Sequence, residues 1–177
     1  MKPTHLKTFS GIKIMDGQKT KSKGFTLNEI IIVLVIIGII SVFAAPRIYD
    51  NYVSNRITAA AKQILADIRF AQSLAMMGHD STWVEFDDNQ NLYKLYSGAT
   101  KATRTLVEKS SGDGSYIRQL DQGEYKNVTI TGLSIGNDKS IAFDWFGNTN
   151  NSGSIILNNT VTITVAMGTG MVRIEGW

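Results

Sequence analysis

A continuous apolar stretch with one carboxylate near its start constrains this chain more than any other feature. Residues 30–40 read IIIVLVIIGII, and Glu29 directly precedes them. The apolar stretch over residues 25–45 would form a helix of roughly 30 Å, one hydrocarbon thickness, at about 1.5 Å per residue. A charge at the bilayer centre costs roughly 2.5–3.5 kcal/mol, so such a group usually has a partner and a role. We therefore predict a membrane and assembly helix over residues 25–46 in which Glu29 is functional.

The segment before this stretch is basic. Residues 1–24 carry six lysines and one aspartate, and by the positive-inside tendency this end is expected to stay in the cytoplasm, with the rest of the chain across the membrane. The full chain has 18 basic and 15 acidic residues, but without residues 1–24 the balance is 12 to 14. The basic excess therefore belongs to the leader and does not indicate a nucleic-acid-binding domain.

Two simpler interpretations of this N-terminal pattern stay open. A secretory signal peptide also combines a basic region, an apolar core and small residues, and Val42, Phe43 and Ala44 would supply its cleavage site. A plain single-pass anchor is the other alternative. The long leader, the length of the apolar segment and the presence of Glu29 disfavour the signal peptide.

The residues around the junction carry a family resemblance. Gly24, Phe25, Thr26, Leu27 and Glu29, followed by the apolar run and Ala45-Pro46, resemble the N-terminal signal of type IV pilins and of the pseudopilins of type II secretion. Asn28 departs from that pattern, because an apolar residue is usual there. The resemblance implies that prepilin peptidase cleaves between Gly24 and Phe25 and that the new Phe25 terminus is N-methylated. It also implies that Glu29 pairs with the cationic amine of Phe25 inside a filament.

The same resemblance implies a structural role and no enzymatic activity. The expected protein is a minor pilin or pseudopilin, anchored in the inner membrane with a periplasmic domain, which enters a pilus or pseudopilus. Its implied partners are prepilin peptidase, an assembly platform protein and other pilins or pseudopilins.

After the membrane segment the pattern changes to that of an amphipathic helix. Apolar residues recur at steps of three and four over residues 47–78, which is one helix face; they are Val53, Ile57, Ala60, Ala61, Ile64, Ile68, Ala71 and Ala75. The charged residues Arg56, Lys62, Asp67 and Arg69 are predicted to lie off this face. Gly78 is expected to end the helix.

Residues 79–177 read as a periplasmic β-sheet domain. Residues 82–86 and 92–96 alternate around a polar turn, which predicts a hairpin. Further short strands are predicted at 104–108, 116–120, 128–131, 140–146, 154–157, 161–166 and 171–174. The predicted fold class is therefore α+β, with a long N-terminal helix, half transmembrane and half amphipathic, packed on an antiparallel β-sheet domain.

The C-terminal third has a second resemblance. Residues 141–147, 153–157, 161–165 and 168–174 are similar to the end of the H-type pseudopilin and FimT group, some members of which are thought to bind DNA through basic residues of the last strand. Here Met171 replaces the first arginine of that strand, Arg173 remains, and Glu175 adds a negative charge. DNA affinity depends on several phosphate-neutralising cations, so Arg173 is a weak candidate ligand contact and DNA is disfavoured as a partner. A filament-tip binding module, for DNA, a secreted substrate or a surface, is the alternative function.

Other chemistry finds little support. The chain has no cysteine, which excludes disulfides and thiolate metal sites. Asp87, Asn89 and Asn91 have the first spacings of a calcium loop, but Leu92 stands where that loop needs glycine, so a hairpin turn is favoured. We predict no cofactor, no metal and no catalytic residue. Trp83, Trp145 and Trp177 are expected to be core or packing residues, with a subunit contact as the alternative for Trp177.

Overall fold

A computed structural model describes residues 24–109, 111–112, 114–149 and 151–176, and of residues 44–50 only the backbone. Most of the predicted leader and Trp177 lie outside the described residues. The chain divides into two compact units, Met1–Phe43 and Ala44–Trp177. One helix, α1 (Leu27–Gly78), contributes to both units.

The ends of α1 follow from local chemistry. The backbone N–H of Glu29 donates to the Thr26 hydroxyl at 3.2 Å, so Thr26 caps the first turn, and Glu29 lies where a negative charge favours the helix dipole. At the other end the chain leaves the helix at Gly78, and His79 takes a left-handed conformation with φ 53°. The predicted end at Gly78 is confirmed.

The domain half of α1 buries the predicted apolar face. Seven of its alanines and isoleucines are 0–6% exposed, and Val53 is partly buried: the buried ones are Ile57, Ala60, Ala61, Ile64, Ile68, Ala71 and Ala75. The small alanines let the helix approach the sheets closely. One prediction here is wrong: Asp67 is 2% exposed and lies on the buried face, because it is three residues from Ile64 and four from Ala71, one helical turn in each direction.

The first sheet is built around the predicted hairpin. β1 (Ser81–Asp87) pairs antiparallel with β2 (Leu92–Gly98), and the Asp87 carboxylate accepts from the backbone N–H groups of Asn89 and Gln90 in the turn. β6 (Ser140–Phe143) adds on the other side of β1. β3 (Thr105–Leu106) and β4 (Ile117–Gln119) both pair with β2. The hairpin is confirmed, with its turn stabilised by an aspartate cap.

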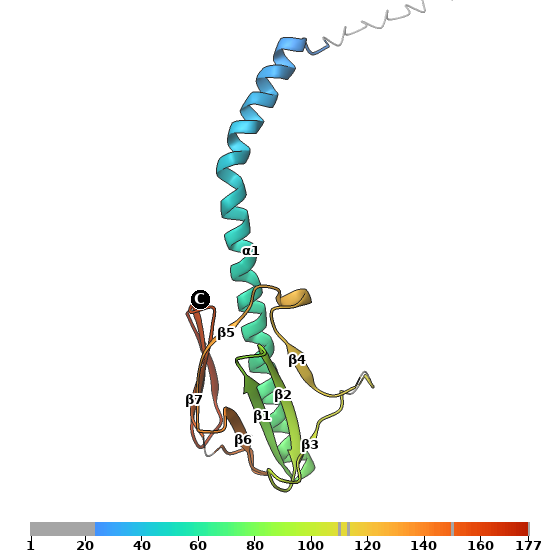
Figure 1. The fold of residues 1–177 in the computed structure, drawn as a ribbon, viewed down its shortest axis with the longest axis vertical. Helices are drawn as coiled ribbons and strands as arrows, with labels where there is room; N and C mark the ends of the chain where they lie inside the picture. The colour runs from blue at the N-terminus through green and yellow to red at the C-terminus, as the bar shows by residue number, and fades with distance from the viewer. Residues whose placement is uncertain (1–23, 110, 113, 150, 177) are drawn as a thin grey trace, which may run out of the picture. The chain divides into compact units, whose positions relative to one another are not determined.

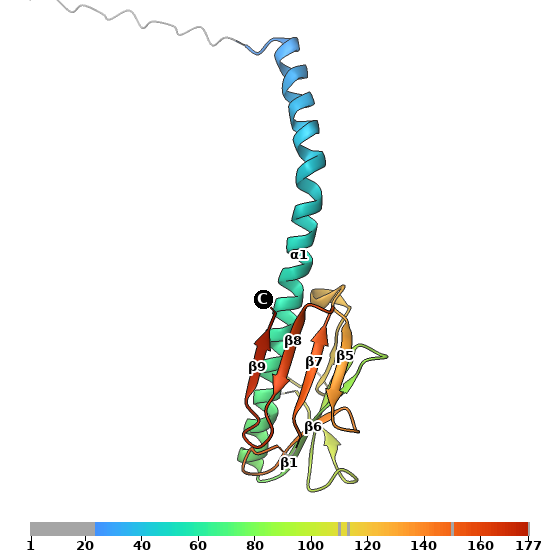
Figure 2. The ribbon, with the colours of Figure 1, turned by 90° about the vertical axis from the view of Figure 1, so that its left-hand side faces the viewer.

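The second sheet has the order β5-β7-β8-β9 and is antiparallel throughout (Figure 2). Its strands are β5 (Ile130–Ile135), β7 (Gly153–Leu157), β8 (Val161–Val165) and β9 (Val172–Glu175), and a short 3-10 helix, η1 (Gly123–Tyr125), precedes them. Buried Thr149 links the two sheets through bridges to Phe143 and Gly168. Inward residues of both sheets close one core around α1 in this unit, so the α+β arrangement is confirmed (Figure 1).

Two expectations about the C-terminal third differ from the structure. β6 ends at Phe143 rather than at residue 146, because Asp144 begins a tight turn in which the Gly147 N–H donates to the Asp144 carbonyl at 2.8 Å. Trp83 is buried as predicted, at 8% exposure, but Trp145 lies on that turn and is 51% exposed. The prediction of a packing role for Trp145 is wrong.

Candidate functional site

The predicted processing site is open at the start of α1. Gly24 and Phe25 precede the helix, and Phe25 is 77% exposed. Glu29 follows in the first turn, where its backbone N–H is held by both oxygens of Thr26 at 3.1 and 3.2 Å. Thr26 and Glu29 have the spacing of a capping box. The geometry leaves the Gly24–Phe25 bond and the Glu29 carboxylate accessible.

The apolar residues after Glu29 have no cover within the described chain. Each residue from 24 to 43 is exposed, including a run of large apolar side chains that continues from Ile30 to Phe43. Ser41 satisfies its hydroxyl on the helix itself by donating to the Ile37 carbonyl at 2.7 Å. Within the residues whose structure is described, no helix meets the length and apolarity needed to cross a membrane, so the membrane helix over residues 25–46 stays a prediction.

The weak ligand candidate, Arg173, lies on the solvent side of β9. Its neighbours in register across the sheet are Thr164 on β8, then Ser154 on β7, and Glu175 follows on the same face. Arg173 and Glu175 line one shallow depression together with Thr164, Val165, Ala166 and Met171. A single guanidinium beside a carboxylate offers little for a phosphate backbone.

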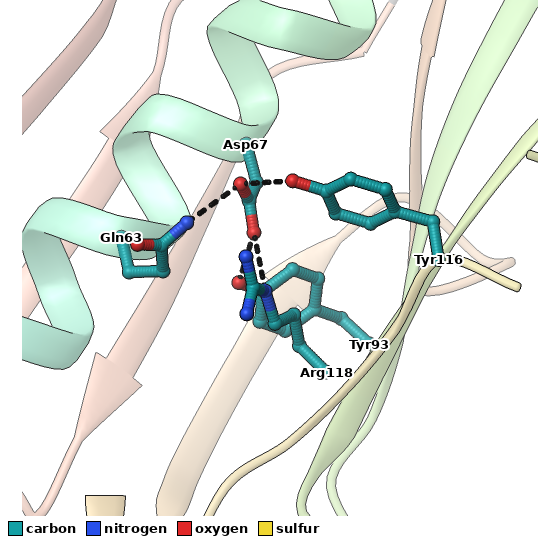
Figure 3. Close-up of polar contacts among 5 residues, drawn as sticks. All are labelled: Gln63, Asp67, Tyr93, Tyr116 and Arg118. Carbon is teal, nitrogen blue, oxygen red and sulfur yellow. Dashed lines mark hydrogen bonds and ion pairs between the residues drawn. The ribbon is translucent and has the colours of Figure 1, made fainter. Parts of the chain in front are cut away.

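The densest polar cluster of the domain surrounds Asp67 (Figure 3). Tyr93 of β2 donates to Oδ2 and Tyr116 donates to Oδ1, both at 2.6 Å. Gln63, one turn earlier on α1, donates to Oδ1 at 2.8 Å, and the Nε of Arg118 lies 3.4 Å from Oδ2. The carboxylate thus accepts from four side chains, which is how a buried charge becomes tolerable.

This cluster alters the titration of its tyrosines. Burial, together with the Asp67 carboxylate that accepts its hydrogen bond, raises the pKa of the Tyr93 hydroxyl well above its usual value. Burial and its own hydrogen bond to the Asp67 carboxylate also raise the pKa of Tyr116. Both tyrosines therefore stay protonated donors over the ordinary pH range. The arrangement joins the helix to β2 and β4 around a carboxylate that is 3% exposed, so we assign it to stability.

Asp67 and Gln72 have structural roles that the sequence pattern did not indicate. Gln72 donates from Nε2 to the carbonyls of Gly147 and Thr169, at 2.7 and 3.0 Å. On a helical wheel at about 100° per residue, Asp67 falls roughly 20° from Ala60, at the edge of the apolar face, and this position would have indicated its burial. Nothing local indicates the partners of Gln72. The described residues contain no group of three or more His, Asp or Glu side chains placed to hold a metal ion.

Comparison with known proteins identifies the family of this chain. The model of the prokaryotic N-terminal methylation motif matches residues 19–45. The type II secretion system core protein G of Aeromonas hydrophila is 31% identical to the chain over 111 residues, which are 62% of this chain and 72% of that protein. The chain belongs to the type IV pilin and pseudopilin superfamily. The predicted superfamily is thus confirmed.

Solved structures agree on the fold. Two structures of the minor pseudopilin EpsH from the type 2 secretion system of Vibrio cholerae match with TM-scores of 0.53 and 0.51. The matched regions cover 68% and 69% of this chain and 96% and 94% of the two EpsH chains, at 8% and 10% sequence identity. At such identity the likeness is one of fold, a helix followed by antiparallel sheets.

Proposed function

We propose that this chain is a minor pilin or pseudopilin, a structural subunit of a type II secretion pseudopilus or a type IV pilus. Prepilin peptidase cleaves it between Gly24 and Phe25, and the new Phe25 amine is methylated. The observation that carries the proposal is the matched methylation motif at an accessible helix start, followed by apolar side chains that the described chain leaves exposed. Such a surface is stable in lipid or against the equivalent helices of other subunits.

The proposal includes a topology. The apolar stretch over residues 25–45 anchors the chain in the inner membrane, the lysine-rich leader stays cytoplasmic, and the β-sheet domain lies in the periplasm. Within a filament, Glu29 pairs with the Phe25 amine of its own chain or of a neighbour, so that neither charge remains unpaired in an apolar surrounding. A separate ATPase and a platform protein drive assembly, and this chain catalyses nothing.

Membership of the H-type pseudopilin and FimT group is a further part of the proposal. It rests on residues 141–174, where a glycine-started apolar strand, a hairpin and a final strand with Arg173 follow one another. The EpsH fold is compatible with this assignment.

The deciding experiment is the intact mass and N-terminal sequence of the protein purified from its host's membranes. A start at Phe25 carrying one methyl group is the expected result. A start near Ala45 would identify a secretory signal peptide instead, and an uncleaved Met1 would identify a plain anchor. Either of these would overturn the filament assignment.

A binding module at the filament tip is the second candidate. An exposed group of aromatic and methionine side chains at one end of the domain suits such a module as well as a contact within the filament. Its lack of cations disfavours DNA as the ligand. Filaments isolated from the host separate the two: a tip module is present at about one copy per filament, whereas a shaft subunit scales with filament length.

A further inference from the structure

Six exposed apolar side chains gather at the end of the domain where α1 finishes. They are 44–68% exposed and comprise Met76, Met77, Trp145, Phe146, Met167 and Met171. They include all four methionines among the described residues. We call this surface the methionine patch. It comes from three segments: the end of α1, the turn after β6 and the hairpin between β8 and β9.

Hydrogen bonds hold these three segments together. The side-chain amide of Gln72 donates to a carbonyl of each turn, Gly147 at 2.7 Å and Thr169 at 3.0 Å. Thr149 and Gly168 exchange two backbone hydrogen bonds, at 2.8 and 3.0 Å, between the same two turns. Figure 1 shows β6 and the end of α1 at the same end of this unit. The patch is therefore a defined surface rather than a meeting of free loops.

The turn that presents the aromatic rings is itself braced. The Asp144 carboxylate accepts from the backbone N–H groups of Phe146 and Asn148 at 2.9 and 2.8 Å. The rings of Trp145 and Phe146 lie 3.8 Å apart between centroids. Gly147 has φ +81°, a conformation that favours glycine, and it lies close to the Met76 side chain, whose sulfur would be 2.9 Å from an added Cβ. The turn thus holds two apolar rings in solvent.

This composition points to a polypeptide ligand. Contiguous exposed apolar surface of a few hundred Å² often marks an interaction site. Methionine side chains are flexible and polarisable, which suits a surface that adapts to apolar side chains of a partner. Rigid aromatic anchors beside them supply contact area at low entropy cost.

The charges narrow the choice of partner. Residues 72–80, 144–149 and 166–171 contain no lysine or arginine, whereas Asp80 and Asp144 lie among them. Arg173 lies two residues beyond Met171, with Glu175 on the same face. A nucleic acid would find almost no cation here. A second copy that docked through the same patch would bring Asp80 and Asp144 of the two chains together, and these like charges disfavour self-association.

We propose that the methionine patch docks an apolar, cation-flanked segment of a different subunit of the same filament. This rests on the proposed function, because a filament holds both partners at high effective concentration and makes a small contact sufficient. The apolar side chains of that segment pack on Trp145, Phe146 and the methionines, and its cations face Asp80.

Photo-crosslinking in the host tests the proposal. Benzoylphenylalanine is placed at Phe146 or Met167, with Ile117, which is 38% exposed on β4, as the control position. We expect the patch positions to form an adduct with another pilin-type subunit, at a peptide that carries apolar residues beside lysine or arginine. Residue 117 should form no such adduct. An adduct only with a second copy of this chain, or only with acidic peptides, overturns the proposal.

A probe at Val35 on the apolar part of α1 reports filament membership independently. Adducts from Val35 without any from the patch overturn the docking proposal alone. Adducts from neither overturn the proposed function and the docking proposal with it. In a further experiment benzoylphenylalanine is placed at Met171, and the yield of its adduct with the partner subunit is measured. The double variant Phe146→Ser/Met167→Ser is expected to lower this yield at least tenfold, whereas Ile117→Ser leaves it unchanged. An unchanged yield in the double variant, with filament incorporation intact, also overturns the docking site.

Discussion

At the scale of single residues, the Asp67 carboxylate holds three separate parts of the chain together. It accepts hydrogen bonds from Tyr93 and Tyr116 and faces the Arg118 guanidinium. Asp67→Asn puts an N–H group toward hydroxyl donors and leaves Arg118 without its counter-charge. We expect it to lower the free energy of unfolding by about 2–4 kcal/mol, a value discounted because Arg118 is 35% exposed. Urea denaturation of the full chain in detergent measures this.

The matched control is Asp138→Asn. Asp138 also forms an ion pair, with Lys101 at 2.6 Å, but both side chains are about half exposed. Solvent screens such a pair, so the control is expected to unfold at the same urea concentration as the unchanged chain. Equal losses in the two variants would contradict a special role for burial at Asp67.

Tyr93 gives the second residue-scale prediction, a pH dependence. Burial and the Asp67 carboxylate raise the pKa of Tyr93 in the folded chain above its unfolded value near 10. Above pH of about 10 the unfolded chain loses the tyrosine proton first, so stability is lost as pH rises toward the folded pKa. Tyr93→Phe removes this contribution. Between roughly pH 9.5 and 11, where tyrosine titrates in the unfolded chain, the free energy of unfolding should fall less steeply for the variant than for the unchanged chain. Equal slopes in both proteins would show that Tyr93 does not titrate differently on folding.

At the scale of elements, the buried face of α1 is a test of close packing. Ala61 is 0% exposed against the sheets, whereas Ala66 lies on the exposed face of the same helix. Alanine and leucine have similar helix propensity, so Ala→Leu isolates the effect of added volume. We expect Ala61→Leu to cost about 1–3 kcal/mol by overpacking and Ala66→Leu to change stability by less than about 0.5 kcal/mol. Thermal unfolding followed by circular dichroism compares them, and similar melting temperatures would refute the tight fit.

The same helix shows what sequence patterns predict and what they miss. Spacing of three and four identified Ile57, Ile64 and Ile68 as core, because helix periodicity depends only on local geometry. Asp67 was placed on the wrong side because a charge was assumed to face solvent. Its burial depends on Tyr93 and Arg118, which are 26 and 51 residues away in sequence and become neighbours only through the fold. The exposed position of Trp145 was missed because the predicted strand continued to residue 146, whereas a turn that begins at Asp144 ends β6 at Phe143.

At the scale of the whole molecule, the sequence predicts the parts better than their partners. The hairpin and the buried helix face follow from local rules, and the superfamily follows from the motif, whereas the cleavage at Gly24 stays a prediction. The methionine patch does not, because its three segments come from residues up to about 95 positions apart and meet through the Gln72 contacts. The proposed function in a filament adds one more level, at which we predict that Glu29 is required for assembly.

Glu29 has two possible contributions, and one substitution separates them. Its position in the first turn of α1 favours the helix start, a role that glutamine also fills in a capping box. Pairing with the cationic Phe25 amine in an apolar surrounding requires the negative charge itself. We therefore expect Glu29→Gln and Glu29→Val both to be cleaved and methylated normally, as mass spectrometry would show, and both to be incorporated into filaments at least tenfold less than the unchanged chain.

Glu124→Gln, a change on the exposed surface of the domain, serves as the control and should assemble normally. Normal incorporation of Glu29→Gln alongside failure of Glu29→Val would assign Glu29 to the helix start and remove the charge pair from the assembly mechanism.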